Sequence, residues 1–118
     1  MTTWWANAPF TDPKLFALWD PPPDGGVYLI LARQPDEGQQ VQYRPVYVGE
    51  TQDFAGDVTE AHRRFGCWAQ EAMGTGHLYV VVCPKEGRRP LDELHRMTIE
   101  AQLVELLDPP CNRGRRRR

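Results

Sequence analysis

Residues 77–83 read His-Leu-Tyr-Val-Val-Val-Cys, an apolar run with three consecutive valines at its centre. β-Branched residues favour strands, and a run without polar alternation is typical of a strand that is covered on both faces. We therefore expect a central strand at 77–83. The elements on either side of this strand then decide the fold class.

A helical pattern lies on each side of the strand. Before it, from Asp57 to Met73, apolar residues recur at three- and four-residue steps, and Gly74-Thr75-Gly76 ends the pattern. After it we expect a turn at 85–90 and then the longest helix, at 91–107. Asp108-Pro109-Pro110 closes that helix because proline cannot continue it.

Two further strands are predicted nearer the N-terminus, at 27–32 and 45–49, where apolar residues of high β-propensity gather. The segment 33–44 between them is rich in turn-forming residues, so we expect a long hairpin loop. A short helix at 13–19 and a stiff Pro-rich lead-in at 21–26 come first. The order predicts a small three-stranded sheet packed by helices.

Composition and charge fit one globular domain with an unusual charge distribution. The chain has 118 residues, of which 41% are apolar and 25% charged, so extensive disorder is excluded. The net charge of −2 hides a body, residues 1–112, of −7 and a tail, 113–118, with five arginines. An acidic body is not the even positive coating of a passive nucleic-acid binder. We expect the tail to be disordered and to attract phosphates without specificity.

Cysteine use and hydropathy predict a cytoplasmic protein that does not enter a membrane. Cys67, Cys83 and Cys111 are an odd set without a C-x-x-C pair, which disfavours disulfides and zinc ribbons and predicts reduced thiols. No apolar run approaches the roughly 20 residues that a membrane helix needs. Residues 1–20 lack the basic start and continuous apolar stretch of a signal peptide.

Two tripeptides lie on consecutive predicted strands, Gly26-Val27-Tyr28 and Tyr47-Val48-Gly49. Four further residues follow these tripeptides along the chain: Thr51, His62 in the next helical pattern, Glu100 in E-x-x-L-V, and Asn112 in P-P-x-N. Eleven residues separate Glu100 from Asn112. Taken together, these residues resemble the signature of the GIY-YIG nuclease superfamily over residues 25–112.

The resemblance implies an α+β fold, a small three-stranded antiparallel sheet flanked by helices, which agrees with the element order above. It places a helix and Pro-rich lead-in at 1–24, the GIY-YIG-like domain at 25–112 and the basic tail at 113–118. Family members hydrolyse nucleic-acid phosphodiesters with one divalent metal ion, so the implied cofactor is one Mg²⁺ or Mn²⁺ and the implied partner is nucleic acid, DNA first. The implied roles are catalytic for Tyr28, Tyr47 and His62, metal-binding for Glu100, and structural for Gly26, Gly49 and Asn112. Arg63 and Arg64, which directly follow His62, are candidate nucleic-acid-binding residues through contacts to phosphate.

General chemistry agrees with several of these roles. Phosphodiester hydrolysis needs a base for water and charge neutralisation at phosphorus, and Mg²⁺ needs only one or two carboxylates. Glu100 lies among apolar residues of its helix, where an acid without a metal or partner is costly. The alternatives are a Glu100 paired with Arg96 or Arg63, tyrosines that are ordinary strand residues, a surface His62, and Arg63 and Arg64 on a solvated helix face.

One part of the pattern is missing. In family members with a similar Y-V-G-E-T stretch, an arginine follows the threonine by six or seven residues, and here those positions hold Asp57 and Val58. Loss of one charge contact to the transition state commonly costs about 10² to 10³ in rate. Two hypotheses follow: an endonuclease with another cation in the arginine's role, or a degenerate domain that binds nucleic acid or a protein partner without cutting.

Overall fold

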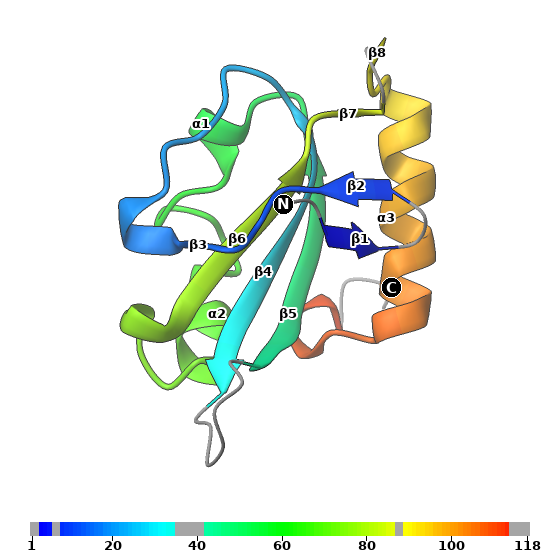
Figure 1. Cartoon of the computed structure of the whole chain (residues 1–118). Coiled ribbons are helices and arrows are strands. Elements are labelled where there is room, and N and C mark those ends of the chain that lie inside the picture. The colour runs from blue at the N-terminus through cyan, green and yellow to red at the C-terminus, as the bar shows by residue number, and fades with distance from the viewer. Residues whose placement is uncertain (1–2, 6–7, 35–41, 87–88, 114–118) are drawn as a thin grey trace.

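A computed structural model describes residues 3–5, 8–34, 42–86 and 89–113. Its centre is one antiparallel sheet of four strands in the order β3-β6-β4-β5 (Figure 1). The strands are β3 (Lys14–Leu15), β4 (Gly26–Gln34), β5 (Gln42–Thr51) and β6 (Leu78–Cys83). Two short hairpins accompany the sheet, β1 (Thr3–Trp5) with β2 (Ala8–Phe10), and β7 (Lys85–Glu86) with β8 (Arg89–Pro90).

The strand predictions are confirmed at their centres, and the α+β class is confirmed. The sheet has four strands, however, where three were expected. The predicted helix at 13–19 is wrong, because Lys14 and Leu15 pair with Val80 and Tyr79 of β6, and only the 3₁₀ helix η1 (Phe16–Leu18) follows. β6 lies inside the sheet, as its apolar sequence predicted. The predicted loop at 33–44 is too long, because residues 33–34 belong to β4 and residues 42–44 to β5. Residues 35–41 of this loop and residues 114–118 of the predicted tail lie outside the described residues.

Alternation along the strands creates two apolar faces. The face that we call the site face carries Tyr28, Ile30, Tyr47, Val80 and Val82. The opposite face, which we call the α3 face after helix α3 (Glu93–Leu107), carries Val27, Leu29, Leu31, Val48 and Val81. Figure 1 shows α3 along one side of the sheet and α1 (Phe54–Asp57) and α2 (Phe65–Glu71) on the other.

The long helix predicted at 91–107 is confirmed as α3 (Glu93–Leu107). The Asp92 carboxylate caps its first turn by accepting a hydrogen bond of 2.8 Å from the His95 N–H. Asp108 ends it with a positive φ of 44°, and Pro109 follows. The buried stripe of this helix is Arg96, Ile99 and Leu103. The sequence therefore sets both ends of α3 through local chemistry.

The helix predicted at 57–73 is broken. Four residues form α1 and seven form α2, and turns occupy 58–64 between them. Phe54 and Val58 are both buried, as they would be in a continuous helix too, because residues four apart share a face. The Thr51 hydroxyl, however, donates to the Asp57 carboxylate, and the chain leaves the helix directly after Asp57. The apolar spacing is present, but packing against the sheet overrides helix periodicity here. His62 consequently lies in a turn.

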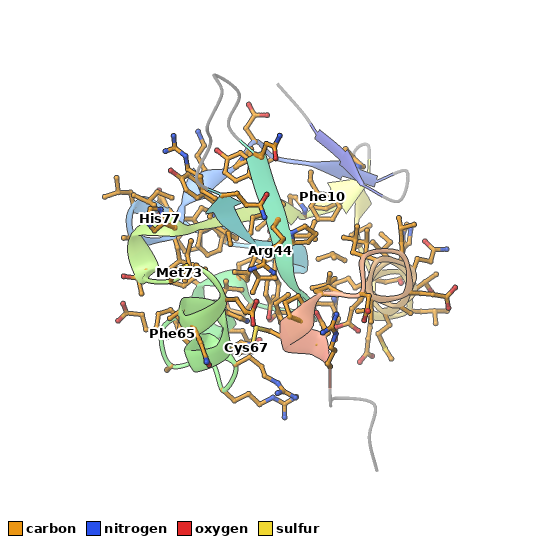
Figure 2. All side chains as sticks on the ribbon, turned by 90° about the horizontal axis from the view of Figure 1, so that it is seen from below. Phe10, Arg44, Phe65, Cys67, Met73 and His77 are labelled. Carbon is orange, nitrogen blue, oxygen red and sulfur yellow. A yellow bond between two sulfur atoms is a disulfide. The ribbon has the colours of Figure 1, made fainter. Side chains whose placement is uncertain are left out.

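The expectation of reduced cysteines is wrong for two of the three. Cys67 of α2 and Cys111 of η3 (Pro110–Asn112) form a disulfide with a Cα–Cα distance of 5.8 Å. Figure 2 shows Cys67 at the end of α2 that lies toward η3. Cys83 is buried in the α3 face and is not part of a disulfide. Among the described helices, none has the length and apolar character to cross a membrane.

Candidate active site

A pocket of about 390 Å³ lies beside the edge strand β5, where the two sides of the sheet meet. Strands β4 and β5, the turns at 58–64 and helix α3 all contribute to it. The lining residues include Tyr28, Tyr47, Glu50, Asp57, His62, Arg63 and Glu100. Five residues singled out from the sequence, at positions 28, 47, 62, 63 and 100, thus line one pocket.

The hairpin of β4 and β5 positions both tyrosines. Ile30 pairs with Tyr47 but Leu31 pairs with Pro45, so Val46 is an extra residue in a β-bulge. The bulge leaves Val46 and Tyr47 on the same side of the sheet. Bulges recur next to active sites because they re-aim a neighbouring side chain. The rings of Tyr28 and Tyr47 lie with centroids 6.0 Å apart.

The glycines of the two tripeptides are explained by close approach. Tyr28 lies opposite Gly49 in the register, and a Cβ atom at Gly49 would overlap the Tyr28 phenol. At Gly26, a Cβ atom would meet the Cys83 carbonyl oxygen. Both positions therefore exclude a side chain, and Gly49 does so because the phenol that enters the pocket covers it.

His62 lies between the two tyrosines and α2. Its Nε2 atom lies 3.2 Å from the Tyr28 hydroxyl, and its Nδ1 atom accepts a hydrogen bond of 2.9 Å from the Arg64 N–H. The imidazole ring also faces Trp68, with centroids 4.5 Å apart and planes 34° apart. Trp68 is completely buried and contacts Tyr47 as well. Both ring nitrogens of His62 and one face of its ring thus have contacts that hold the ring in place.

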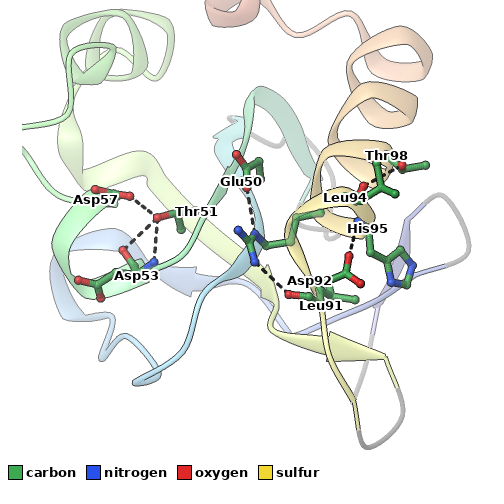
Figure 3. Close-up of polar contacts among 10 residues, drawn as sticks. Glu50, Thr51, Asp53, Asp57, Leu91, Asp92, Leu94, His95 and Thr98 are labelled. Atoms are coloured by element: carbon green, nitrogen blue, oxygen red, sulfur yellow. Dashed lines mark hydrogen bonds and ion pairs between the residues drawn. The ribbon is translucent and has the colours of Figure 1, made fainter.

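Three carboxylates line the pocket, and their surroundings differ. The Arg96 Nε–H donates to Glu50 at 2.9 Å, and Arg96 Nη1 donates to the Leu91 carbonyl at 3.0 Å (Figure 3). The Thr51 hydroxyl donates to the Asp57 carboxylate. Glu100 enters from the middle of α3 and is partly exposed. Arg96, named in the sequence as a possible partner of Glu100, forms an ion pair with Glu50.

The cations are distributed unevenly. Arg63 is the single Lys or Arg among the lining residues of the described chain. Arg64 contributes its main-chain N–H to His62, while its Nε atom is buried without a hydrogen-bond partner among the described residues. Of the two positions where the resemblance places an arginine, Asp57 lines the pocket and Val58 packs in the core.

Asn112 ties the end of the chain to the sheet. Its Oδ1 atom accepts from the Val48 N–H at 2.8 Å, and its Nδ2 donates to the Val48 carbonyl at 2.9 Å. Val48 adjoins Tyr47, and Cys111 carries the disulfide to α2. The segment 111–112 therefore braces β5 and α2 from the same point.

Sequence reasoning missed Glu50, Arg96 and the Trp68 platform as parts of the site. Arg96 shares the buried stripe of α3 with Ile99 and Leu103, and a charge on an apolar stripe signals a buried partner. Glu50 directly follows the second tripeptide. Its position could have indicated that a carboxylate lies three residues from Tyr47 on the same strand. Trp68 gave no signal beyond its place in the helical pattern.

The donor atoms available for a metal ion are carboxylate oxygens. In the described part of the chain, no group of three or more His, Cys, Asp and Glu side chains is arranged to hold a metal ion. A complete protein cage of the kind that binds structural zinc is therefore not formed by these residues. Comparisons with protein-family models, with curated proteins and with solved structures found no match.

Proposed function

We propose that the protein hydrolyses phosphodiester bonds of nucleic acid, with DNA as the first candidate substrate, at the pocket beside β5. The observation that carries the proposal is the convergence of Tyr28, Tyr47, His62 and Glu100 on this pocket. These residues come from two strands, a turn and a helix, and the sequence predicts a site role for each of them. The resemblance to GIY-YIG nucleases gives the reaction class.

The pocket offers a base and an orienting group. Of the two phenols, Tyr28 has the hydrogen bond with His62 that can orient it and stabilise charge on its oxygen. As a phenolate, Tyr28 takes a proton from water, and the resulting hydroxide attacks phosphorus while the bond to the leaving oxygen breaks. The leaving oxygen must then gain a proton from water or from the site. The ring centroid of Tyr47 lies 6.0 Å from that of Tyr28, and both residues line the pocket.

The carboxylates fit one Mg²⁺ or Mn²⁺. Mg²⁺ usually keeps several waters and binds through one or two carboxylates together with substrate phosphates, so three protein ligands are not required. Glu100 would hold the ion at the pocket. Glu50 is held by Arg96 and Asp57 by Thr51. A bound ion would supply positive charge for the phosphate and the leaving oxygen.

Arg63 is the best candidate for the missing arginine. It is the cation that lines the pocket among the described residues, although it follows His62 in sequence instead of preceding it by four. A cation near the phosphate stabilises the charge that develops in the transition state. Arg64, by contrast, does not line the pocket, and its Nε atom is buried, so we assign it no phosphate contact.

A plasmid-nicking assay with purified protein and Mg²⁺ or Mn²⁺ tests the proposal. Glu100→Gln keeps the size of the side chain and removes its charge, so we expect cleavage to fall by at least about 10²-fold. Glu105→Gln is the matched control, because Glu105 is exposed on the same helix outside the pocket. Nicking that survives Glu100→Gln unchanged would mean a contaminating nuclease and would refute the assignment.

Asp57 favours the second candidate function, a domain that binds nucleic acid or a protein partner without cutting. It lines the pocket where a phosphate would lie, and like charges repel. Asp57→Asn separates the two candidates. If the wild type cleaves, the variant cleaves faster. If the domain only binds, the variant binds labelled DNA more tightly in low salt and still leaves it intact. If neither binds DNA, a protein partner remains.

The cytoplasm is the compartment that we propose, because the substrate class is found there. Disulfides in reducing compartments are usually transient or redox-responsive, so Cys67–Cys111 would then depend on the state of the cell. Alkylation of thiols in intact cells before lysis, followed by mass spectrometry, gives the fraction of Cys67 and Cys111 that is oxidised. A fully oxidised pair would contradict this compartment.

A further inference from the structure

The hydrogen bonds of His62 define which of its nitrogens carries the proton. The Arg64 N–H is a main-chain donor, so the nitrogen that faces it must be an acceptor. A proton on Nδ1 would point at another N–H across 2.9 Å, where two donors repel. Rotating the ring by 180° would place carbon atoms against both Arg64 and Tyr28, so the observed orientation is the one that satisfies both contacts.

We propose that His62 is a fixed hydrogen-bond donor to Tyr28 and therefore a positioning residue, not the base that removes the phenolic proton. With Nδ1 unprotonated, a neutral imidazole carries its proton on Nε2, the atom 3.2 Å from the Tyr28 oxygen. Nε2–H can donate to this oxygen but cannot receive another proton. The Tyr28 proton must therefore leave in a direction other than His62.

The surroundings of His62 keep this arrangement in place. The His62 N–H donates to the Thr59 carbonyl at 3.0 Å, and the Phe65 N–H donates to the His62 carbonyl at 2.9 Å. Trp68, which is completely buried, supports the ring face. Because the Arg64 donor belongs to the main chain, no side-chain rotation at 64 removes it. The proton position on His62 is thus set by the backbone of the turn.

A donor role deepens the proposed function, on which its catalytic meaning rests. A hydrogen bond donated to an oxygen favours the charged, deprotonated form of that oxygen. His62 would then hold the Tyr28 phenolate ready for water and fix its direction in the pocket. A histidine base would do the opposite, since it would need an unprotonated Nε2. A donor and a base are expected to respond differently to substitutions that place an amide nitrogen where one imidazole nitrogen of His62 lies.

Nuclear magnetic resonance tests the proton position without any cleavage assay. In long-range ¹H–¹⁵N correlation spectra of the ¹⁵N-labelled full chain at mildly alkaline pH, we expect the His62 pattern of a protonated Nε2 and an unprotonated Nδ1. His77 is exposed and provides an internal comparison, and a His62→Gln spectrum identifies the His62 signals. An Nδ1–H tautomer, or a doubly protonated ring under these conditions, would overturn the proposal whether or not the protein is a nuclease.

Two amide substitutions test the role in cleavage. The amide nitrogen of glutamine reaches the place of Nε2 and that of asparagine the place of Nδ1. We expect His62→Gln to retain cleavage within about tenfold of wild type, the cost of one imperfect hydrogen bond, and His62→Asn to lose about 10²-fold.

Equal losses for both amide variants in the presence of Tyr28 would mean that His62 accepts a proton, and the donor role would be refuted. A wild type that does not cleave would refute the proposed function instead, and the resonance experiment would still decide the proton position. The two failures are therefore distinguishable.

Discussion

The two faces of the sheet are built differently. The site face is covered by helices of four and seven residues and packs aromatic rings, among them Tyr28, Tyr47 and Trp68. The α3 face packs mainly aliphatic side chains such as Leu29 and Leu31 under one helix of 15 residues. One sheet thus separates a mainly aliphatic core from an aromatic core that borders the pocket.

The two faces also differ in how the segments that cover them are held in place. Helices shorter than about 12 residues are marginal by themselves, so α1 and α2 depend on tertiary contacts. The disulfide from Cys67 to Cys111 and the hydrogen bonds from Asn112 to Val48 supply such contacts at one point. The α3 face has a longer capped helix and shows no covalent link among its described residues.

The largest loss of stability is expected on the α3 face. Leu31 is nearly fully buried there, and Leu31→Ala should lower the free energy of unfolding by about 3 to 4 kcal/mol, since it removes apolar contacts and leaves a cavity. Urea unfolding measures this change. Cleavage corrected for the folded fraction should stay within a few-fold, because Leu31 lies on the face away from the tyrosines. If cleavage by the folded fraction of Leu31→Ala falls far below that of the wild type, the two faces are not independent.

The disulfide should contribute somewhat less stability but affect the site more. Replacing Cys67 and Cys111 together by alanine removes a link across 44 residues, which should cost about 2 to 4 kcal/mol. Wild-type protein treated with a dithiol should shift by a similar amount, as the dithiol becomes oxidised and the two cysteines become thiols. Urea midpoints with and without dithiol measure both effects.

Cys83→Ala is the control for the disulfide, because Cys83 lies on the α3 face and outside the disulfide. That variant should keep its response to dithiol, and the double alanine variant should lose it. In the double variant the Nε2–H signal of His62 should broaden or move, since Trp68 directly follows Cys67. If the urea midpoint of the wild type is the same with and without dithiol, the disulfide does not stabilise the site face.

The sequence predicted the parts of the fold that local chemistry determines. Strands β4, β5 and β6 follow from runs of apolar residues of high β-propensity, and the end of α3 follows from the prolines after it. These signals lie within a few residues of each other. The cap at Asp92, which starts α3 at Glu93, was not predicted. The three-stranded estimate failed because β3 has two residues, too few for any pattern.

The parts that failed depend on contacts between distant segments. The pairing of Cys67 with Cys111 is a property of the folded chain, and an odd cysteine count without a C-x-x-C pair argued against it. The break between α1 and α2 brings His62 beside Tyr28 and Tyr47, and these tyrosines are distant from it in sequence. For the site, residue types at known spacing pointed to the pocket, whereas the Glu50–Arg96 pair needed the register of β5 against α3.

The smallest of the three expected stability losses concerns Asn112, where one side chain satisfies two main-chain groups. Asn112→Ala leaves the N–H and the carbonyl of Val48 without these partners in a buried position, which should cost about 2 to 3 kcal/mol. Asp108→Asn is a nearby control, because asparagine tolerates the positive φ at this position, and the ion pair with Arg113 that it removes is exposed and should contribute less than about 1 kcal/mol. Because Val48 adjoins Tyr47, Asn112→Ala should also reduce cleavage in fully folded protein. If the two variants instead unfold at the same urea concentration, the hydrogen bonds of Asn112 add no measurable stability. The disulfide would then be the contact through which segment 111–112 stabilises the site face.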